Sequence, residues 1–417
     1  MTNVCSNVCS NVCSTGGAAA RSELGLELGP ELGKVSARSV PLAVYAFGAG
    51  IFAMTTSEFM VAGLMPELAA AFGVSTASIG YLISIYSGGM VVGGPVLTMA
   101  LLRIDRRRAL LLMMAVFVLG QVLAASASTY GLMATGRFVT GASSAAFFAV
   151  SIAAAADMAG AEARGRAASV VLAGLMLSTV LGVPIVTILG QDLDWRTSFW
   201  IVAMLVALCG GMVAATTPRL PHAEGIDLRG ELGALANGRL WAAYATSGLI
   251  IAATFAAFSY FSPIFIDVSG FDAALVPYLF GIYGAATVAG NIVVGRFADR
   301  HAIAVLLIGL SILTVTLVLL ALFAHVQVAT VVLTVVLGLV GVTMNPAMVV
   351  RVMRAANPRP LVNAVHGAVI SLGVLVGSSL GGLAIAAGLG YLAPVWIGAV
   401  LALLGLLSLA PANARRF

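Results

Sequence analysis

The segments Arg103-Ile104-Asp105-Arg106-Arg107-Arg108 and Gly295-Arg296-Phe297-Ala298-Asp299-Arg300 decide the fold, because each follows an apolar stretch and each contains Asp-Arg. The first comes after the glycine-bearing helix end Gly93-Gly94-Pro95, and the second after Gly290. The same arrangement therefore occurs twice, six apolar stretches apart. Internal repetition of this kind is typical of transporters, whose substrate site lies between the two halves near the middle of the membrane.

Twelve apolar stretches of helix-spanning length lie between Pro41 and Pro411. A span needs about 20 apolar residues, because a helix satisfies its own backbone hydrogen bonds in lipid. The composition agrees, since 61% of the residues are hydrophobic and only 9% are charged, which a soluble core does not explain. The predicted spans are 41–63, 77–101, 109–128, 131–156, 167–190, 198–217, 240–263, 274–295, 302–323, 326–349, 362–387 and 392–411.

Basic residues are distributed unevenly between the loops. Of the 21 Lys and Arg residues, all except Arg137 and Arg196 lie at the termini or in even-numbered loops. The positive-inside rule assigns these regions to the cytoplasm. We therefore expect a multi-pass protein of the cell membrane with both termini cytoplasmic. The net charge of +5 is then explained by arginines that set the membrane topology beside acidic lipid headgroups. It does not indicate a surface that binds nucleic acid.

The expected fold class is an all-α integral membrane protein with two pseudo-symmetric six-helix bundles. The predicted segments are a low-complexity, disordered cytoplasmic tail (1–39), an N-terminal bundle (40–217), a cytoplasmic linker (218–239), a C-terminal bundle (240–411) and a short cytoplasmic tail (412–417). The first tail repeats Asn-Val-Cys-Ser three times. No histidine lies near these cysteines, and the surrounding Asn, Ser and Gly favour disorder, so we expect no metal site there.

Signatures of enzymatic chemistry are missing from the sequence. No loop is long enough for a soluble catalytic domain of usual size. A phosphate-binding P-loop lysine motif is absent, which excludes ATP hydrolysis as the energy source. The four histidines are scattered, which disfavours haem or zinc chemistry. We therefore expect neither an enzyme nor a cofactor.

Several motifs resemble the major facilitator superfamily. The Asp-Arg loop is similar to its best-known motif, and Thr56-Ser57-Glu58-Phe59-Met60-Val61-Ala62-Gly63-Leu64-Met65-Pro66 resembles the first span of its twelve-helix drug/proton antiporters, which include chloramphenicol exporters and arabinose-type efflux permeases. Further similar segments are Arg164-Gly165-Arg166-Ala167, Gly182-Val183-Pro184, Trp195-Arg196-Thr197-Ser198-Phe199-Trp200 and Leu392-Ala393-Pro394-Val395-Trp396. The resemblance covers about residues 40–411 and implies the major facilitator fold. The chain departs from the pattern at Arg107, where Gly is usual, and at Val183, which separates Gly182 from Pro184.

Glu58 and Arg137 are the most informative ionisable residues within the predicted spans. A charge at the centre of the bilayer costs at least ~2.5 kcal/mol, which favours a functional role. We expect Glu58 to load and release a proton, and the resemblance implies an acid at this position. Arg137 keeps its own proton, so we expect it to hold the carboxylate ionised or to gate its protonation. The alternatives are an interhelical hydrogen bond or an interfacial position for Glu58, and a structural Arg137 bonded to helix-end carbonyls.

Charged residues at the predicted cytoplasmic helix ends suggest a conformational latch. We expect an ion pair and helix-dipole contacts to hold the outward-facing state. The alternative is that these charges only set the orientation of the chain in the membrane. The predicted latch residues are Asp105, Arg106, Asp157, Asp299 and Arg300.

Small residues punctuate the fifth span and suit a rocking interface, although such residues are common in membrane helices. They are Gly174, Gly182, Pro184 and Gly190. A mainly apolar cavity with a few polar anchors fits a small amphiphilic ligand. The candidate substrate-binding residues are Tyr45, Met54, Thr55, Tyr86, Phe147, Phe148, Phe255, Phe258, Tyr260 and Asn345. His366 is interpreted as a hydrogen-bonded structural residue.

These features together predict proton-coupled efflux of small hydrophobic drugs by alternating access. The resemblance favours chloramphenicol-like antibiotics as substrates, and a monomer would suffice. Efflux of sugars or other small metabolites by the same fold is the alternative. It is less favoured because the spans are poor in Asn, Gln and charge. A non-transporting membrane sensor or embedded enzyme would need a signalling domain or a nucleophile–base set, and the sequence shows neither.

Overall fold

A computed structural model describes residues 40–101, 104–160, 163–219, 233, 235–356 and 360–409. Both predicted tails, most of the predicted linker and Arg103 lie outside these residues. The chain divides into Met1–Ser39 and one compact unit, Val40–Phe417. The described residues are helical, with no strand among them, as expected for an all-α membrane protein.

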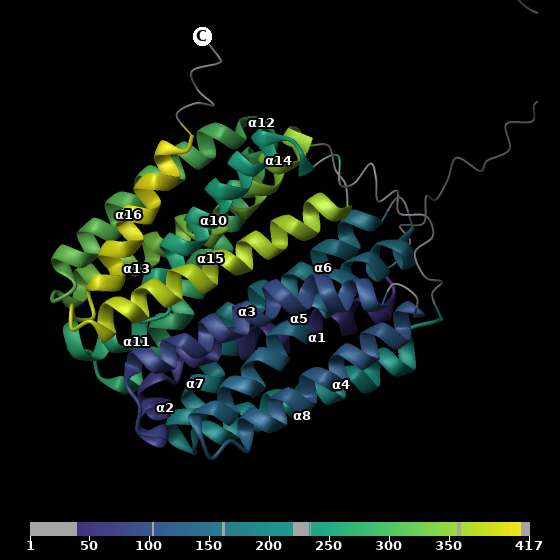
Figure 1. The fold of residues 1–417 in the computed structure, drawn as a ribbon, viewed down its shortest axis with the longest axis horizontal. Helices are drawn as coiled ribbons and strands as arrows, with labels where there is room; N and C mark the ends of the chain where they lie inside the picture. The colour runs from purple at the N-terminus through teal and green to yellow at the C-terminus, as the bar shows by residue number, and fades with distance from the viewer. Residues whose placement is uncertain are drawn as a thin grey trace, which may run out of the picture. The chain divides into compact units, whose positions relative to one another are not determined.

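The first set of helices contains six spans (Figure 1). They are α1 (Leu42–Gly63), α3 (Thr76–Leu101), α4 (Arg106–Ala125), α5 (Tyr130–Ala159), the continuous α6–η1–α7 (Arg164–Leu177, Ser178–Gly182 and Val183–Asp192) and α8 (Trp195–Thr216). Helix α5 packs against α3 and α4, whereas α1 packs against α6 and α8. Most residues of α1 are buried, so α1 lies inside the set and brings its polar residues into the protein rather than to lipid.

The second set follows the described end of the linker. Its elements are α10 (Gly238–Phe258), α11 (Phe261–Pro263), η2 (Ile264–Val268), η3 (Ala273–Leu275), α12 (Val276–Phe323), α13 (Gln327–Val340), η4 (Val342–Met344), α14 (Asn345–Ala356), α15 (Pro360–Ala386) and α16 (Ala393–Leu407). Helix α10 packs against α15 and α16, and α12 packs against α13, α14 and α16.

The number of membrane crossings agrees with the sequence. Ten helices in the described part of the chain are long and apolar enough to cross a membrane. One of them contains α12, which has non-helical torsion angles at His301 and therefore joins two spans across a kink. The shorter apolar helix α16 adds another crossing. Counted in this way, the helices give the twelve predicted spans.

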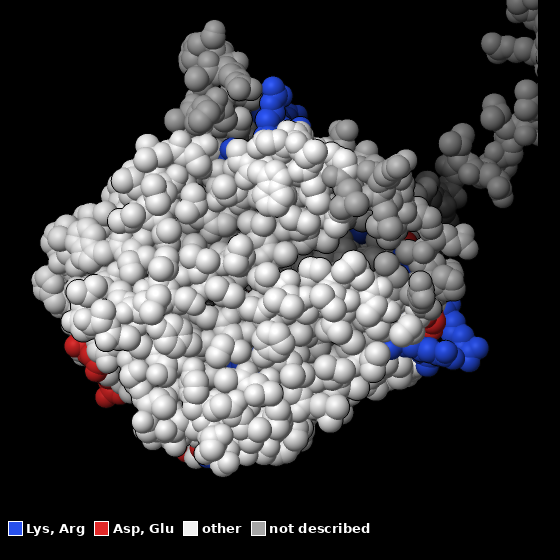
Figure 2. Space-filling model, viewed as in Figure 1, with Lys and Arg blue, Asp and Glu red and all other residues white. Residues whose placement is uncertain are grey.

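Charged residues mark the two ends of the helices. We call the end that carries Arg106, Arg164, Arg300 and Arg354 the basic end, and the other end the distal end. Arg106 pairs with Asp157 at the C-terminus of α5, and Asn237 donates to the carbonyl of Ala355 at the C-terminus of α14, so within each set these loops lie at one end. Figure 2 shows the largest groups of Lys and Arg along this edge and the largest group of Asp and Glu at the opposite edge.

The two sets meet through α3 and α15, and through α12 against η1 and α7. Several hydrogen bonds join them near the distal end. Ser378 donates to the carbonyl of Gly80 at 2.9 Å, and Ser262 donates to the carbonyl of Ala62 at 2.6 Å. Figure 2 shows the surface hollowed between the sets toward the basic end. The sets are therefore in contact at the distal end and apart toward the basic end.

The fifth and tenth predicted spans both contain breaks. Pro184 led us to expect a bend in the fifth span, whereas the break in the tenth was not predicted. Pro184 has no N–H group for the carbonyl four residues earlier, and the π-helical turn η1 precedes it. In the tenth span, the backbone leaves helical geometry at Gly341 (φ −73°, ψ −106°), and α14 restarts at Asn345 with Pro346 in its first turn. Proline is tolerated there because the first N–H groups of a helix have no intrahelical partner.

Candidate functional site

Arg137 lies fully buried on α5 and contacts both α1 and α3. Its Nη1 donates to the carbonyl of Ser57 at 2.7 Å and to Ser57 Oγ at 3.1 Å, while Nη2 donates to the carbonyl of Glu58 at 3.0 Å. The guanidinium carbon lies 4.3 Å from the centre of the Tyr86 ring, within the range of a cation–π interaction. Among the described residues, Nε is buried without a hydrogen-bond partner. Arg137 therefore binds two carbonyls of the α1 backbone, which lie within the last two turns of that helix.

Glu58 lies half-buried on α1, directly beside this contact. The ion pairs found among the described residues are Arg106–Asp157 and Arg196–Asp194, so the Glu58 carboxyl does not pair directly with Arg137. The two side chains nevertheless interact electrostatically through the protein interior. The structure thus places the two predicted residues together, with the guanidinium bonded to the backbone of Glu58 and not to its carboxyl.

Two residues that the sequence analysis missed complete the Arg137 site. Ser57 Oγ donates to Gln121 Oε1 at 2.9 Å, and Gln121 Nε2 donates to the carbonyl of Phe199 at 3.4 Å. Ser57 and Gln121 are fully buried. The sequence contains a signal that could have identified Gln121. A lone amide within an apolar span must find hydrogen-bond partners when it is buried.

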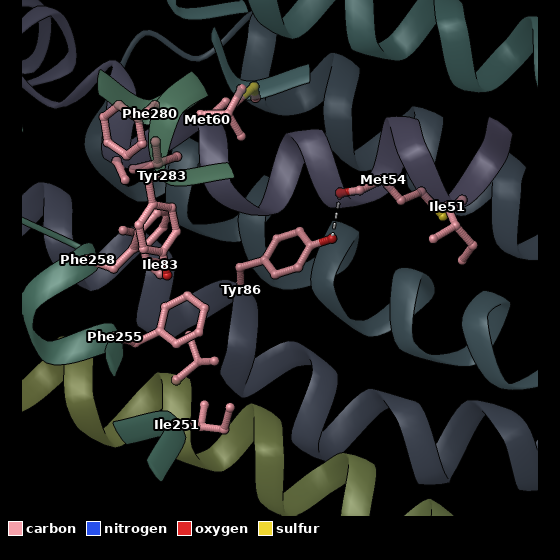
Figure 3. Packing of buried hydrophobic residues seen from close by; sticks show 14 of the residues in the cluster. Ile51, Met54, Met60, Ile83, Tyr86, Ile251, Phe255, Phe258, Phe280 and Tyr283 are labelled. Atoms are coloured by element: carbon pink, nitrogen blue, oxygen red, sulfur yellow. Dashed lines mark hydrogen bonds between the residues drawn. The ribbon is translucent and has the colours of Figure 1, made fainter. Parts of the chain in front are cut away.

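An aromatic cluster connects the two sets next to Glu58. Phe59 of α1 stacks on Phe255 of α10 with ring centres 5.5 Å apart, and its ring centre lies 5.7 Å from that of Phe258. Phe258 also contacts Phe280 and Tyr283 of α12 at 5.6 and 5.1 Å. Figure 3 shows Phe258, Phe280 and Tyr283 grouped together, with Tyr86 in the same view. Of these rings, the sequence analysis named Phe255, Phe258 and Tyr86 and missed the others, because contacts between distant spans leave no local pattern.

The remaining substrate-binding candidates of the first set occupy different environments. Tyr45 is 52% exposed and lies on α1 toward the basic end. Met54 and Thr55 are buried, and Tyr86 donates its hydroxyl to the Met54 carbonyl at 3.2 Å (Figure 3). Phe147 is buried and Phe148 is half-buried on α5.

In the second set, two predicted residues lie at helix breaks. Tyr260 follows the end of α10 and donates to the carbonyl of Ser378 at 2.8 Å. Asn345 opens α14, and its Oδ1 is buried without a hydrogen-bond partner among the described residues. His366 lies 3.1 Å from Ser247 Oγ through its Nε2, which is consistent with the structural interpretation.

Three of the predicted latch residues form contacts within their own set, namely Arg106, Asp157 and Asp299. Arg106 pairs with Asp157, and Asp105 lies at the N-cap of α4. In the second set, the Asp299 carbonyl accepts a hydrogen bond from Arg354, and the neighbouring Arg300 is exposed. The Arg106–Asp157 pair is present while the two sets touch at the distal end. The pair is therefore not confined to a state in which the distal end is open.

The small residues of the fifth span face α1. A Cβ added at Gly174 would overlap the carbonyl of Gly48, and one added at Gly182 would overlap the Thr56 hydroxyl. Gly190 approaches Leu64 in the same way. Pro184 lies on another face, against Gly281 of α12. The span thus packs closely on α1 through its glycines and meets the second set through Pro184.

Sequence comparison identifies the family. The sequence profile of the Major Facilitator Superfamily matches residues 47–358 and 278–415. The chain belongs to this superfamily. It is 33% identical over 395 residues to a chloramphenicol resistance protein of Streptomyces lividans, which covers 90% of this chain and 100% of that protein.

Two further relatives are membrane transport proteins by name. The chain is 32% identical over 375 residues to the inner membrane transport protein YdhP of Escherichia coli strain K12, which covers 90% of this chain and 95% of that protein. It is 29% identical over 367 residues to the uncharacterized MFS-type transporter YtbD of Bacillus subtilis strain 168, with 86% and 92% covered. The predicted family and fold class are therefore confirmed: this is a multi-pass membrane transporter that acts on a small-molecule substrate.

Proposed function

We propose that this transporter exports small hydrophobic drugs in exchange for protons, and that chloramphenicol-like antibiotics are its favoured substrates. The observation that carries the proposal is the position of Glu58, an acid within a span that lies beside the buried Arg137. The adjacent Phe59 joins the aromatic cluster of the second set. The name of the Streptomyces relative supports the substrate class.

The exchange takes place at the Glu58 carboxyl. When this group holds a proton it is neutral, and the Arg137 charge is stabilised by the α1 carbonyls and the Tyr86 ring. When the proton leaves, the new carboxylate lies next to a guanidinium whose buried Nε donor has no hydrogen-bond partner within the described part of the chain. The apolar part of a drug packs against the aromatic cluster, so that drug and proton compete at neighbouring positions on α1.

The transport direction follows from the proposed orientation. The basic end faces the cytoplasm by the positive-inside rule, so both termini are cytoplasmic and the hollow between the sets admits drug from that side. Rocking of the sets then opens the distal end, where Ser378–Gly80 and Ser262–Ala62 must separate. We expect the predicted latch residues at the basic end to hold that second state through contacts beyond the Arg106–Asp157 pair, which is already formed while the distal end is closed. A single chain contains every part of this cycle, which is consistent with a monomer.

One proton per cycle provides enough energy. Export against a hundredfold gradient requires about 2.7 kcal/mol, at ~1.4 kcal/mol for each factor of ten. One inward proton supplies about 2.3 kcal/mol per 100 mV, and a pH difference of one unit adds about 1.4 kcal/mol. The lone acid at position 58 is therefore sufficient to drive antibiotic resistance by efflux.

Proteoliposomes with an imposed pH gradient test the proposal. Chloramphenicol should accumulate on the acidic side, and collapse of the gradient with an ionophore should abolish accumulation. A sugar panel in the same vesicles tests the alternative substrate class. Transport that is indifferent to the pH gradient would refute proton coupling, and uptake of sugars without uptake of drug would refute the substrate class.

A further inference from the structure

Gln121 is a buried polar side chain in an otherwise apolar part of α4. The other buried residues of this helix are Ala, Leu, Met, Phe and Gly. A buried amide is costly unless it is hydrogen-bonded, and Gln121 meets this condition through Ser57 on one side and the Phe199 carbonyl on the other. The amide therefore connects three helices, α1, α4 and α8, at the level of Arg137.

The hydrogen bonds run in one direction from Arg137 to Phe199. Arg137 is a donor without acceptor atoms, so Ser57 Oγ accepts from it and has its own proton left to donate. Gln121 Oε1 takes that proton. The Phe199 carbonyl can only accept, which fixes the orientation of the amide. Removal of Gln121 would leave the Ser57 hydroxyl without its acceptor.

We infer that Gln121 is a positioning residue, which acts through Ser57 to hold the Arg137 guanidinium on the α1 carbonyls and away from the Glu58 carboxyl. By fixing this geometry, Gln121 sets the pH range over which Glu58 exchanges its proton. The inference rests on the proposed proton exchange at Glu58. The inference adds Gln121 of α4, a helix that contributes no ionisable group to the proton exchange.

The sign of the effect follows from the groups around Glu58. Arg137 of α5 and Tyr86 of α3 are the titratable groups that interact with it. Charged residues on the other elements packed against α1 lie toward the helix ends or at the α12 kink; they are Glu67, Arg164, Arg166, Asp192, Arg196, Arg296, Asp299 and Arg300. A guanidinium released from Ser57 can turn toward Glu58 and favour its ionised form. Proton loading then needs a more acidic medium.

The test measures drug–proton exchange as a function of pH in proteoliposomes that contain the full chain. Gln121→Leu and Ser57→Ala should each move the half-maximal pH of exchange downward by about one unit. The double variant should shift no further than either single variant, because both changes break the same link. Thr246→Val is the matched control, since it removes a hydroxyl that links α10 to Ser408 in the second set. Its pH profile should equal that of the unmodified protein.

The outcomes separate this inference from the proposed function. If the unmodified protein shows no proton-coupled exchange, the proposed function fails. If it exchanges normally and Gln121→Leu lowers only the rate or the thermal stability, with an unchanged half-maximal pH, Gln121 is structural and the inference is overturned. Additive shifts in the double variant would also overturn it, because Gln121 would then not act through Ser57. Should Gln121→Leu fail to fold, Ser57→Ala carries the same comparison.

Discussion

The substitution Arg137→Lys keeps the buried charge and removes the planar fork that binds α1. The guanidinium reaches two carbonyls, one hydroxyl and the Tyr86 ring simultaneously. An ammonium group is a point charge on a flexible stem and cannot occupy all these positions. The substitution therefore tests whether the geometry of Arg137, and not its charge alone, holds α1 against α5.

The expected loss of stability follows from the contacts. Hydrogen bonds between membrane helices average ~0.6 kcal/mol and reach ~1.7 kcal/mol, so the loss of two costs about 1–3 kcal/mol. Loss of the desolvated cation–π contact adds about 1 kcal/mol or more. We expect the free energy of unfolding to fall by about 2–4 kcal/mol in total.

Unfolding in mixed micelles, followed by the fluorescence of the four tryptophans, measures this difference. Arg196→Lys is the matched control, because Arg196 also lies 4.3 Å from an aromatic ring and donates to a carbonyl, but is 42% exposed. Exposed contacts of this kind contribute at most ~1 kcal/mol. Equal losses in the two variants, or an Arg137→Lys protein as stable as the unmodified one, would refute the reasoning.

Three other predictions concern the distal end and the latch. Gly80→Ala should favour opening at the distal end by about 1–3 kcal/mol, because its Cβ would overlap the Tyr260 hydroxyl. Spin labels across α3 and α15 should then report longer distances. Gly131→Ala should not change them, because its Cβ would meet no described residue within 4 Å. Burial raises the pKa of the Glu67 carboxyl in α2 (Met65–Phe72) above 4.5, so the folded state binds this proton more tightly and stability falls as the pH rises through that range. At neutral pH, Glu67→Gln should therefore melt at a higher temperature than the unmodified protein, and this difference should shrink at acidic pH. The same pH dependence of the melting temperature in both proteins would contradict this. Asp157→Asn should lower stability by less than ~1 kcal/mol, because the Arg106–Asp157 pair is partly exposed, and it should slow transport. An unchanged transport rate would contradict the latch and leave membrane topology as the role of these charges.

The sequence predicted the spans well because lipid imposes simple requirements on a helix. The predicted span 362–387 is the helix Pro360–Ala386, and the predicted span 77–101 is the helix Thr76–Leu101. Each needs a continuous apolar run and a backbone that bonds to itself, and both properties can be read locally. The short helix α2 was missed because its eight residues are too few to cross a membrane.

The sequence indicated which residues belong to the candidate site but not which hydrogen bonds they form. Glu58 and Arg137 are recognisable as costly charges within spans, and the structure brings them together. The sequence cannot show that Arg137 donates to carbonyls of α1, since every residue offers the same carbonyl group. Phe59 was missed for a related reason, because its contact with Phe255 depends on how the two sets meet.

The Glu58 carboxyl is the centre of the proposed mechanism, and the most direct measurement is proton release on addition of chloramphenicol to the purified protein in weakly buffered detergent solution. The unmodified protein should release protons as drug binds, and the release should saturate with drug concentration. Glu58→Gln should insert in the membrane and keep its fold but release none. Drug-driven proton release from Glu58→Gln equal to that of the unmodified protein would contradict the account.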